Sequence, residues 1–97
     1  MNSKRLTDNV LAQNLAGLDG WQLNDDSTAI SRSFRFRDFN AAFGFMSRIA
    51  LMAERLDHHP EWSNVYNRVD ITLSTHDVGG LSEKDMVLAR FINELGA

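Results

Sequence analysis

The stretch "DFNAAFGFMSRIALMAERLDHHP", residues 38–60, decides how the chain folds. Its apolar residues recur at the 3.6-residue period of an amphipathic helix. Asp38 is a favourable N-cap residue. Pro60, the only proline in the chain, disfavours a helical conformation for the residue before it. The stretch therefore predicts a long helix over residues 39–57, with His58 at or near its C-terminus and His59 outside it.

Extended segments flank this helix on both sides. Residues 30–37 alternate apolar and polar side chains and pair with 21–23 across a turn-like segment at 24–27, which predicts a hairpin. Residues 62–66 and 69–75 predict two further strands. In the second of these, the odd-numbered residues 69–75 face one way and the even-numbered residues 70–76 the other.

Two more helices are expected near the ends of the chain. The first begins at Thr7 or Asp8, and the last begins at Ser82, which forms a capping-box pattern with Asp85. The last helix carries an apolar stripe from which Met86 is excluded, formed by Val87, Leu88, Phe91, Ile92 and Leu95. The element order α-β-β-α-β-β-α predicts an α+β fold, a four-stranded antiparallel sheet with three helices packed on one face, in one domain over residues 1–97.

The composition excludes several classes of protein. The net charge of −3 comes without a Lys/Arg cluster, which argues against direct nucleic-acid binding. Because there is no cysteine, the chain has no disulfide and no thiol nucleophile. Its first residues lack the apolar segment of a signal peptide, and no apolar run approaches the length of a membrane span. We expect a cytoplasmic protein without a membrane interaction.

Two of the three histidines are adjacent, and all three can meet at one rim of the fold. His58 and His59 leave the long helix, while His76 ends the last strand. Glu54, Asp57 and His58 are spaced to share one side of the helix. A pocket with three imidazoles and one or two carboxylates is compatible with this spacing.

Other roles are open for each of these residues. His58 could be a cation at a helix C-terminus, where the helix dipole favours it. Three histidines and an acid could bind zinc, but adjacent residues usually point apart, and helical metal motifs use i, i+4 spacing. Trp62 and Tyr66 could be packing aromatics, and the capping box is a sufficient role for Asp85.

The chain resembles the pterin-4a-carbinolamine dehydratase family. The resemblance rests on Glu54-x-x-x-His58-His59-Pro60, Tyr66, Val69, Thr75-His76, Gly80-Leu81-Ser82 and Asp85. The stretch "DFNAAFGFMSRIALMAERLDHHPEWSNVYNRVDITLSTH", residues 38–76, is similar to the animal-type members. The likeness runs from about Leu6 to the C-terminus.

The resemblance implies dehydration of 4a-hydroxytetrahydrobiopterin, the carbinolamine that an aromatic amino acid hydroxylase leaves, to quinonoid dihydropterin, without metal or organic cofactor. Its catalytic groups are His58, His59 and His76. We expect His59 and His76 at the reacting edge and His58 assisting, with Trp62 closing the pocket. The expected substrate contacts are Glu54, Asp57, His58, His59, Pro60, Trp62, Ser74, Thr75, His76 and Asp77.

Two functions of other classes are weighed beside catalysis. Animal relatives also act as dimerisation cofactors of a transcription factor, so a protein-interaction module is the alternative. A zinc hydrolase is the second rival.

On a helical wheel the apolar positions of residues 39–57 cover about 200°, twice the stripe that seals one sheet, with Leu51 outside this arc. The excess predicts a homo-oligomer, and the resemblance implies a tetramer, or a dimer, built by joined sheets and paired helices.

Overall fold

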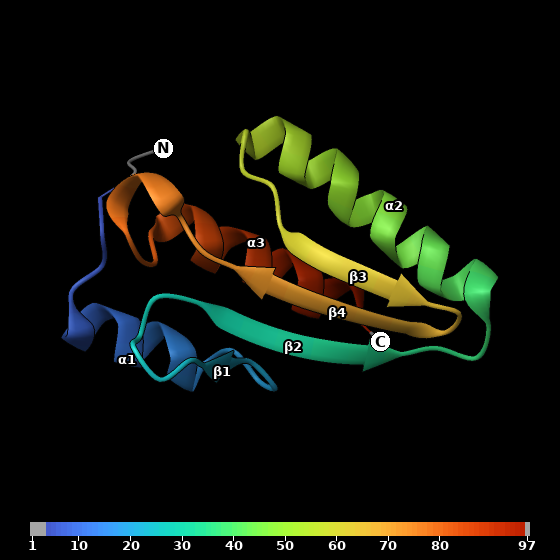
Figure 1. The fold of residues 1–97 in the computed structure, drawn as a ribbon, viewed down its shortest axis with the longest axis horizontal. Coiled ribbons are helices and arrows are strands. Elements are labelled where there is room, and N and C mark those ends of the chain that lie inside the picture. Colours follow the sequence, from blue (N-terminus) through green and yellow to red (C-terminus); the bar gives the residue numbers. More distant parts are fainter. Residues whose placement is uncertain (1–3, 97) are drawn as a thin grey trace.

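One antiparallel sheet organises residues 4–96, the part of the chain that the computed structural model describes. Its strands β1 (Gln22–Leu23), β2 (Ile30–Arg35), β3 (Glu61–Val65) and β4 (Arg68–Leu73) lie in the order β1-β2-β4-β3. The helices are α1 (Asp8–Ala16), α2 (Phe39–Leu56) and α3 (Glu83–Leu95), and a short 3-10 helix, η1 (His76–Val78), follows β4. The predicted fold class and element order are confirmed, and α3 passes behind the central strands in Figure 1.

The two faces of the sheet differ in burial as the alternation predicts. Val69, Ile71 and Leu73 of β4 are buried, while Asp70 and Thr72 between them are only half-buried. The buried face joins the helices in one hydrophobic core. Its members from the helices and β2 include Leu11, Ile30, Phe34, Ala42, Phe45, Ile49, Leu88 and Ile92.

Side-chain caps fix where the helices begin. The Oδ1 atom of Asp38 accepts a hydrogen bond from the Ala41 amide at 2.8 Å, and Thr7 caps α1 in the same way. In α3 both halves of the predicted capping box between Ser82 and Asp85 are present. These contacts satisfy amide groups that have no partner inside the helix.

One prediction about α3 is wrong. Met86 was excluded from the apolar stripe, yet its side chain is fully buried in the core. The buried residues of α3 are Asp85, Met86, Leu88, Ala89 and Ile92, whereas Val87 and Phe91 of the predicted stripe are only half-buried, so the buried face is rotated around the helix from the predicted one. Asp85 beside it is fully buried as well, which places an acid inside the protein.

Candidate active site

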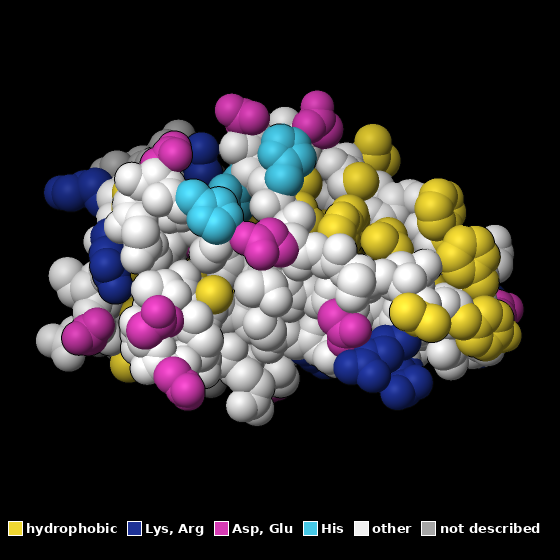
Figure 2. All heavy atoms as spheres, viewed as in Figure 1, with side chains coloured by type: hydrophobic (Ala, Val, Ile, Leu, Met, Phe, Trp, Pro, Cys, Tyr) yellow, Lys and Arg dark blue, Asp and Glu magenta, His cyan; other side chains and the backbone are white. Residues whose placement is uncertain are grey.

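A cavity of about 290 Å³ lies where the C-terminus of α2 meets the end of β4. It is lined by Asp57, His58, His59, Ser74, Thr75, His76, Asp77 and Lys84. The space-filling view shows the histidine side chains gathered on this rim with acidic side chains beside them (Figure 2). The volume is near the lower end of the range for small-molecule sites.

The left-handed conformation of Asp57 separates the two adjacent histidines. Asp57 ends α2 with φ 50° and ψ 47°, and its amide bonds back to the carbonyls of Ala53 and Glu54. This sharp exit turns the chain out of the helix ahead of Pro60. As a result His58 is buried, whereas His59 is exposed.

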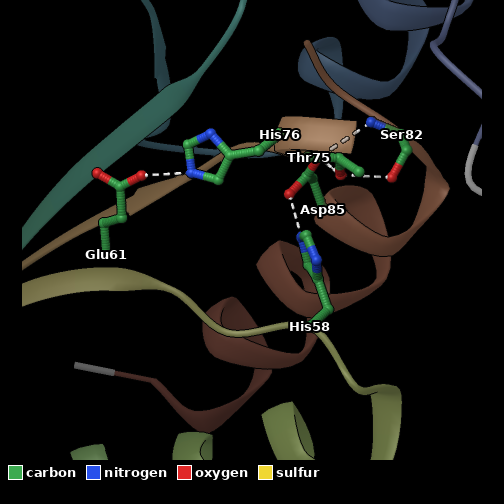
Figure 3. A network of polar contacts seen from close by, with 6 residues as sticks. All are labelled: His58, Glu61, Thr75, His76, Ser82 and Asp85. Carbon is green, nitrogen blue, oxygen red and sulfur yellow. Dashed lines mark hydrogen bonds and ion pairs between the residues drawn. The ribbon is translucent and has the colours of Figure 1, made fainter. Parts of the chain in front are cut away.

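His58 belongs to a buried polar network (Figure 3). Its Nε2 atom lies 2.5 Å from Oδ1 of Asp85. The Oδ2 atom of Asp85 accepts hydrogen bonds from the Thr75 hydroxyl at 2.7 Å and from the Ser82 amide at 2.9 Å. The hydroxyls of Thr75 and Ser82 are also bonded to each other at 2.7 Å. The network therefore joins the segments that follow α2 and β4 to the first turn of α3, beside the cavity.

The other two histidines also contact carboxylates, but at the surface. The Nε2 atom of His59 lies 2.6 Å from Oε1 of Glu54, one turn back on α2. The Nε2 atom of His76 lies 2.9 Å from Oε1 of Glu61, the first residue of β3. Both pairs are exposed to solvent, so they are weaker constraints than the His58–Asp85 contact.

All three imidazoles share one hydrogen-bonding pattern. An ionised carboxylate only accepts hydrogen bonds, so the Nε2 atom of each ring carries the proton that it donates. Three carboxylates from three different elements thus fix the tautomer of three histidines.

The cavity unites seven of the ten residues predicted for the site. Glu54 stays outside the lining and reaches it only through His59. Pro60 lies in the connection to β3 and is half-buried. Trp62 pairs with Ile71, on the helix-covered face of the sheet, and packs against the core, so it does not line this cavity.

Three further residues at the site were not predicted to act there. The partner of His58, Asp85, was interpreted as a capping acid, although it is also one of the residues that carry the family resemblance. Glu61 and Lys84 were not singled out, since a Glu beside a proline and a Lys in a first helical turn are common surface residues. The signal that could have indicated Asp85 is its place among the residues that carry the family resemblance.

Metal sites and membrane-spanning helices are both absent from residues 4–96. No group of three or more histidine, aspartate or glutamate side chains there has the arrangement of a metal site. Among the same residues, no helix has both the length and the apolarity that a membrane span requires.

Comparison with known proteins decides the family. A sequence model described as pterin 4 alpha carbinolamine dehydratase matches residues 4–95. The chain belongs to the pterin-4-alpha-carbinolamine dehydratase family. A relative from Rhizobium etli, provisionally named as such a dehydratase, is 54% identical over 97 residues, which cover all of this chain and 96% of the relative. A relative from Brucella ovis with the same provisional name is 54% identical, with 98% of each chain covered.

Two solved structures share the dehydratase fold. A crystal structure described as a transcriptional coactivator/pterin dehydratase from Brucella melitensis is 53% identical, with a TM-score of 0.92 over 97% of this chain and 100% of that one. A pterin dehydratase-like protein described as a RuBisCO assembly factor of the alpha-carboxysome is 19% identical. Its TM-score of 0.68 covers 80% of this chain and 90% of that one, and at this identity the likeness concerns the fold alone.

Proposed function

We propose that the protein dehydrates pterin-4a-carbinolamine (4a-hydroxytetrahydrobiopterin) to quinonoid dihydropterin by histidine acid–base catalysis. The observation that carries the proposal is the set of three imidazoles at one cavity, each bound through Nε2 to a carboxylate. Family membership supplies the substrate class.

The reaction requires one proton to be given and another to be removed. The hydroxyl on C4a leaves as water after it receives a proton, and the N5 lone pair forms the C4a=N5 double bond as the C4a–O bond breaks. The proton on N5 then passes to a base. Histidine suits both roles because its ordinary pKa of about 6.5 is close to neutral pH.

Exposure divides these roles among the three rings. His59 and His76 are exposed and both line the cavity, so we assign the acid and the base to this pair. His58 is buried and held by Asp85, so its role is to assist from the cavity wall. The substrate contacts that we propose are the other lining groups of the predicted set, Asp57, Ser74, Thr75 and Asp77.

The biological role follows from the substrate. The carbinolamine is the product of aromatic amino acid hydroxylases, so the protein would recycle their pterin and act in the cytoplasm beside such an enzyme. The proposed chemistry needs no metal or organic cofactor. Activity that survives dialysis against a chelator would separate this reaction from that of a zinc hydrolase.

The decisive experiment follows carbinolamine generated by a hydroxylase. Its decay, monitored by absorbance, should be faster with the protein than without it, and His59→Ala should abolish most of the acceleration. Decay at the uncatalysed rate with a folded protein would contradict the proposed function.

A second proposal concerns an apolar surface patch. Phe39, Phe43 and Leu51 of α2 are 48%, 57% and 71% exposed, and Val65 and Tyr66 at the end of β3 are exposed as well. Figure 2 shows hydrophobic side chains gathered over α2 and toward the far end of the molecule. We propose that this patch forms a homo-oligomer, a tetramer or else a dimer, because exposed patches of this kind mark interaction sites.

The same patch also suits a protein-interaction module. The Brucella melitensis structure is described as a transcriptional coactivator as well as a dehydratase. A pull-down with a dimeric transcription factor, done beside the dehydratase assay, tests this alternative. Binding without activity would favour the interaction module over catalysis.

A further inference from the structure

Lys84 is a cation at the cavity that has no hydrogen-bond or ion-pair partner among the described residues. It is the second residue of α3, is half-buried, and lines the cavity together with the three histidines. Its ammonium group makes no hydrogen bond or ion pair within residues 4–96. An ammonium group has three donors and no acceptor, so all three donors of Lys84 are available to a ligand.

The acidic neighbours of Lys84 are engaged elsewhere. Glu83 pairs with Arg90 at 3.1 Å, and the Asp85 carboxylate is occupied by His58, Thr75 and Ser82. The other acids of the lining, Asp57 and Asp77, form no ion pair with Lys84, although both lie at the same cavity.

The charge of Lys84 is also unfavourable at its position in α3. The first turn of a helix carries the positive end of the helix dipole, which favours acidic side chains and disfavours a lysine. The stability of α3 therefore gives no reason for a cation there. A reason does exist if a bound molecule presents a hydrogen-bond acceptor to it.

We infer that Lys84 binds the substrate by donating a hydrogen bond to the C4 carbonyl oxygen of the pterin ring. This inference rests on the proposed function, since it takes the substrate to be a pterin. The C4 carbonyl is bonded to C4a, the carbon that loses the hydroxyl, so a pterin whose C4a faces the histidines brings this oxygen to the same cavity. The carbonyl is present in the substrate and in the product, and Lys84 holds it throughout the reaction.

The kinetic signature of this role is an increase in KM. An interaction that is equally strong before and during the reaction contributes to binding and leaves kcat unchanged. Lys84→Met should raise KM about tenfold or more, because a charged hydrogen bond is lost, and should change kcat by less than about threefold. Lys84→Arg keeps the charged donor and should keep KM close to that of the unmodified protein.

A matched control removes a cation from another part of the molecule. Arg48 of α2 lines a separate cavity with Asn40 and Phe43, and Arg48→Met should leave both constants unchanged. Lys84→Met should melt no lower than the unmodified protein, since Lys84 makes no hydrogen bond or ion pair within residues 4–96 and methionine keeps an unbranched apolar stem. An unchanged KM in Lys84→Met would overturn the inference, whatever the change in kcat.

Direct binding separates this inference from the proposed function. The Kd of 7,8-dihydropterin should rise about tenfold in Lys84→Met, whereas the Kd of a 2,4-diaminopteridine, which has an amino group at C4, should not change. Equal losses for the two ligands would overturn the assignment to the carbonyl. If the unmodified protein bound dihydropterin without dehydrating the carbinolamine, the proposed function would fail while this measurement still decided the role of Lys84.

Discussion

The Nε2 atom of His58 lies 2.5 Å from Oδ1 of Asp85, a fully buried carboxylate 27 residues further along the chain. The same carboxylate closes the capping box of α3 and accepts a hydrogen bond from Thr75. One acid thus fixes a helix end, a strand end and a histidine of the cavity. Stability and the geometry of the site depend on the same side chain.

Asp85→Ala should therefore cost more than an ordinary helix cap. The substitution leaves His58, Thr75 and the Ser82 amide without their acceptor in a buried place, and each unsatisfied group costs about 1–3 kcal/mol. We expect the free energy of unfolding to fall by about 3 kcal/mol or more, and kcat/KM to fall with it. Chemical denaturation beside the absorbance assay measures both.

Thr7→Ala provides the reference for a simple cap. Thr7 caps α1 at an exposed position, so its loss should cost about 1 kcal/mol and leave activity unchanged. If Asp85→Ala cost no more than Thr7→Ala, the network beside the cavity would not contribute to stability as we argue.

Substitution of the exposed histidines should lower activity and leave stability nearly unchanged, in contrast to Asp85→Ala. His59→Ala and His76→Ala should each lower kcat/KM by about 10² or more, as the loss of an acid or base does. Neither ring is part of the core, so the melting temperature should change little. Steady-state kinetics and thermal melts on the same samples check this pair of expectations.

His58→Ala is the informative comparison for these two variants. It leaves the buried carboxylate of Asp85 without a charged or polar partner at Oδ1, so its main effect should be on stability. Full activity in His59→Ala and His76→Ala would show that the acid and the base lie elsewhere.

Replacement of Asp57 by glycine should raise stability and lower activity. Asp57 adopts a left-handed conformation at the end of α2, where glycine is preferred. Asp57→Gly should raise the free energy of unfolding by about 0.5–1 kcal/mol, yet lower kcat/KM because a carboxylate is lost from the cavity. Asp57→Asn, which tolerates the same conformation, should lower activity without the gain in stability. A less stable Asp57→Gly variant would contradict this account.

Local signals in the sequence were sufficient for the fold. The cap at Asp38, the proline after the two histidines and the alternation in β4 each depend on neighbours in the chain, and the structure confirms these elements. The strand ends at Leu73, two residues before its predicted end, and His76 begins η1 instead of ending the strand. The burial of Met86 was missed because the wheel centred the stripe on large apolar residues, whereas the buried face of α3 is rotated toward Asp85, Met86 and Ala89 and leaves Val87 and Phe91 half-buried.

The site was less accessible to sequence reasoning, for a physical reason. The spacing around His58 indicated Glu54 and Asp57, which are local, but its buried partner, Asp85, comes from a distant helix. The partner of His76 is Glu61, which depends on how β3 and β4 are paired. Trp62 follows the same rule, because strand register directs its side chain to the core.

Asp70, on the sheet face opposite the core, should make the stability of the protein depend on pH, independently of the candidate active site. The Ser33 hydroxyl, which donates to Asp70 at 2.5 Å, and then Arg68 lower the pKa of Asp70 below its ordinary 3.8. A lowered folded-state pKa gives stability that is present above the unfolded value and is lost as pH falls through the folded one. Ser33→Ala should raise this pKa, and its destabilisation at about pH 7 should shrink toward about pH 2.

Ser31→Ala is the matched control for this effect. The Ser31 hydroxyl is bonded to Thr72, which does not titrate, so its loss should be the same at both pH values. NMR titration of the Asp70 carboxyl measures the pKa directly. An unchanged pKa in Ser33→Ala would show that the hydroxyl does not stabilise the charged form.

The last prediction is that the protein is an oligomer in solution. β3 is an edge strand of the sheet, and the exposed apolar side chains of α2 lie on the neighbouring element. An uncovered edge can pair with a second copy, and an exposed apolar patch loses contact with water when two copies meet. Light scattering at micromolar concentration should give about four times the 11.0 kDa of one chain, or twice it for a dimer.

Substitutions on α2 separate the two kinds of contact. Phe43→Lys and Leu51→Lys place charges in the proposed helix interface, so a tetramer should fall to a dimer joined through β3. Val10→Lys places the same charge on α1, where Val10 is 39% exposed, and should leave the mass unchanged. A mass of one chain for the unmodified protein would contradict the oligomer. If the tetramer persisted with both α2 substitutions, its interface would lie on another surface, because burying two lysines in an apolar contact is strongly unfavourable.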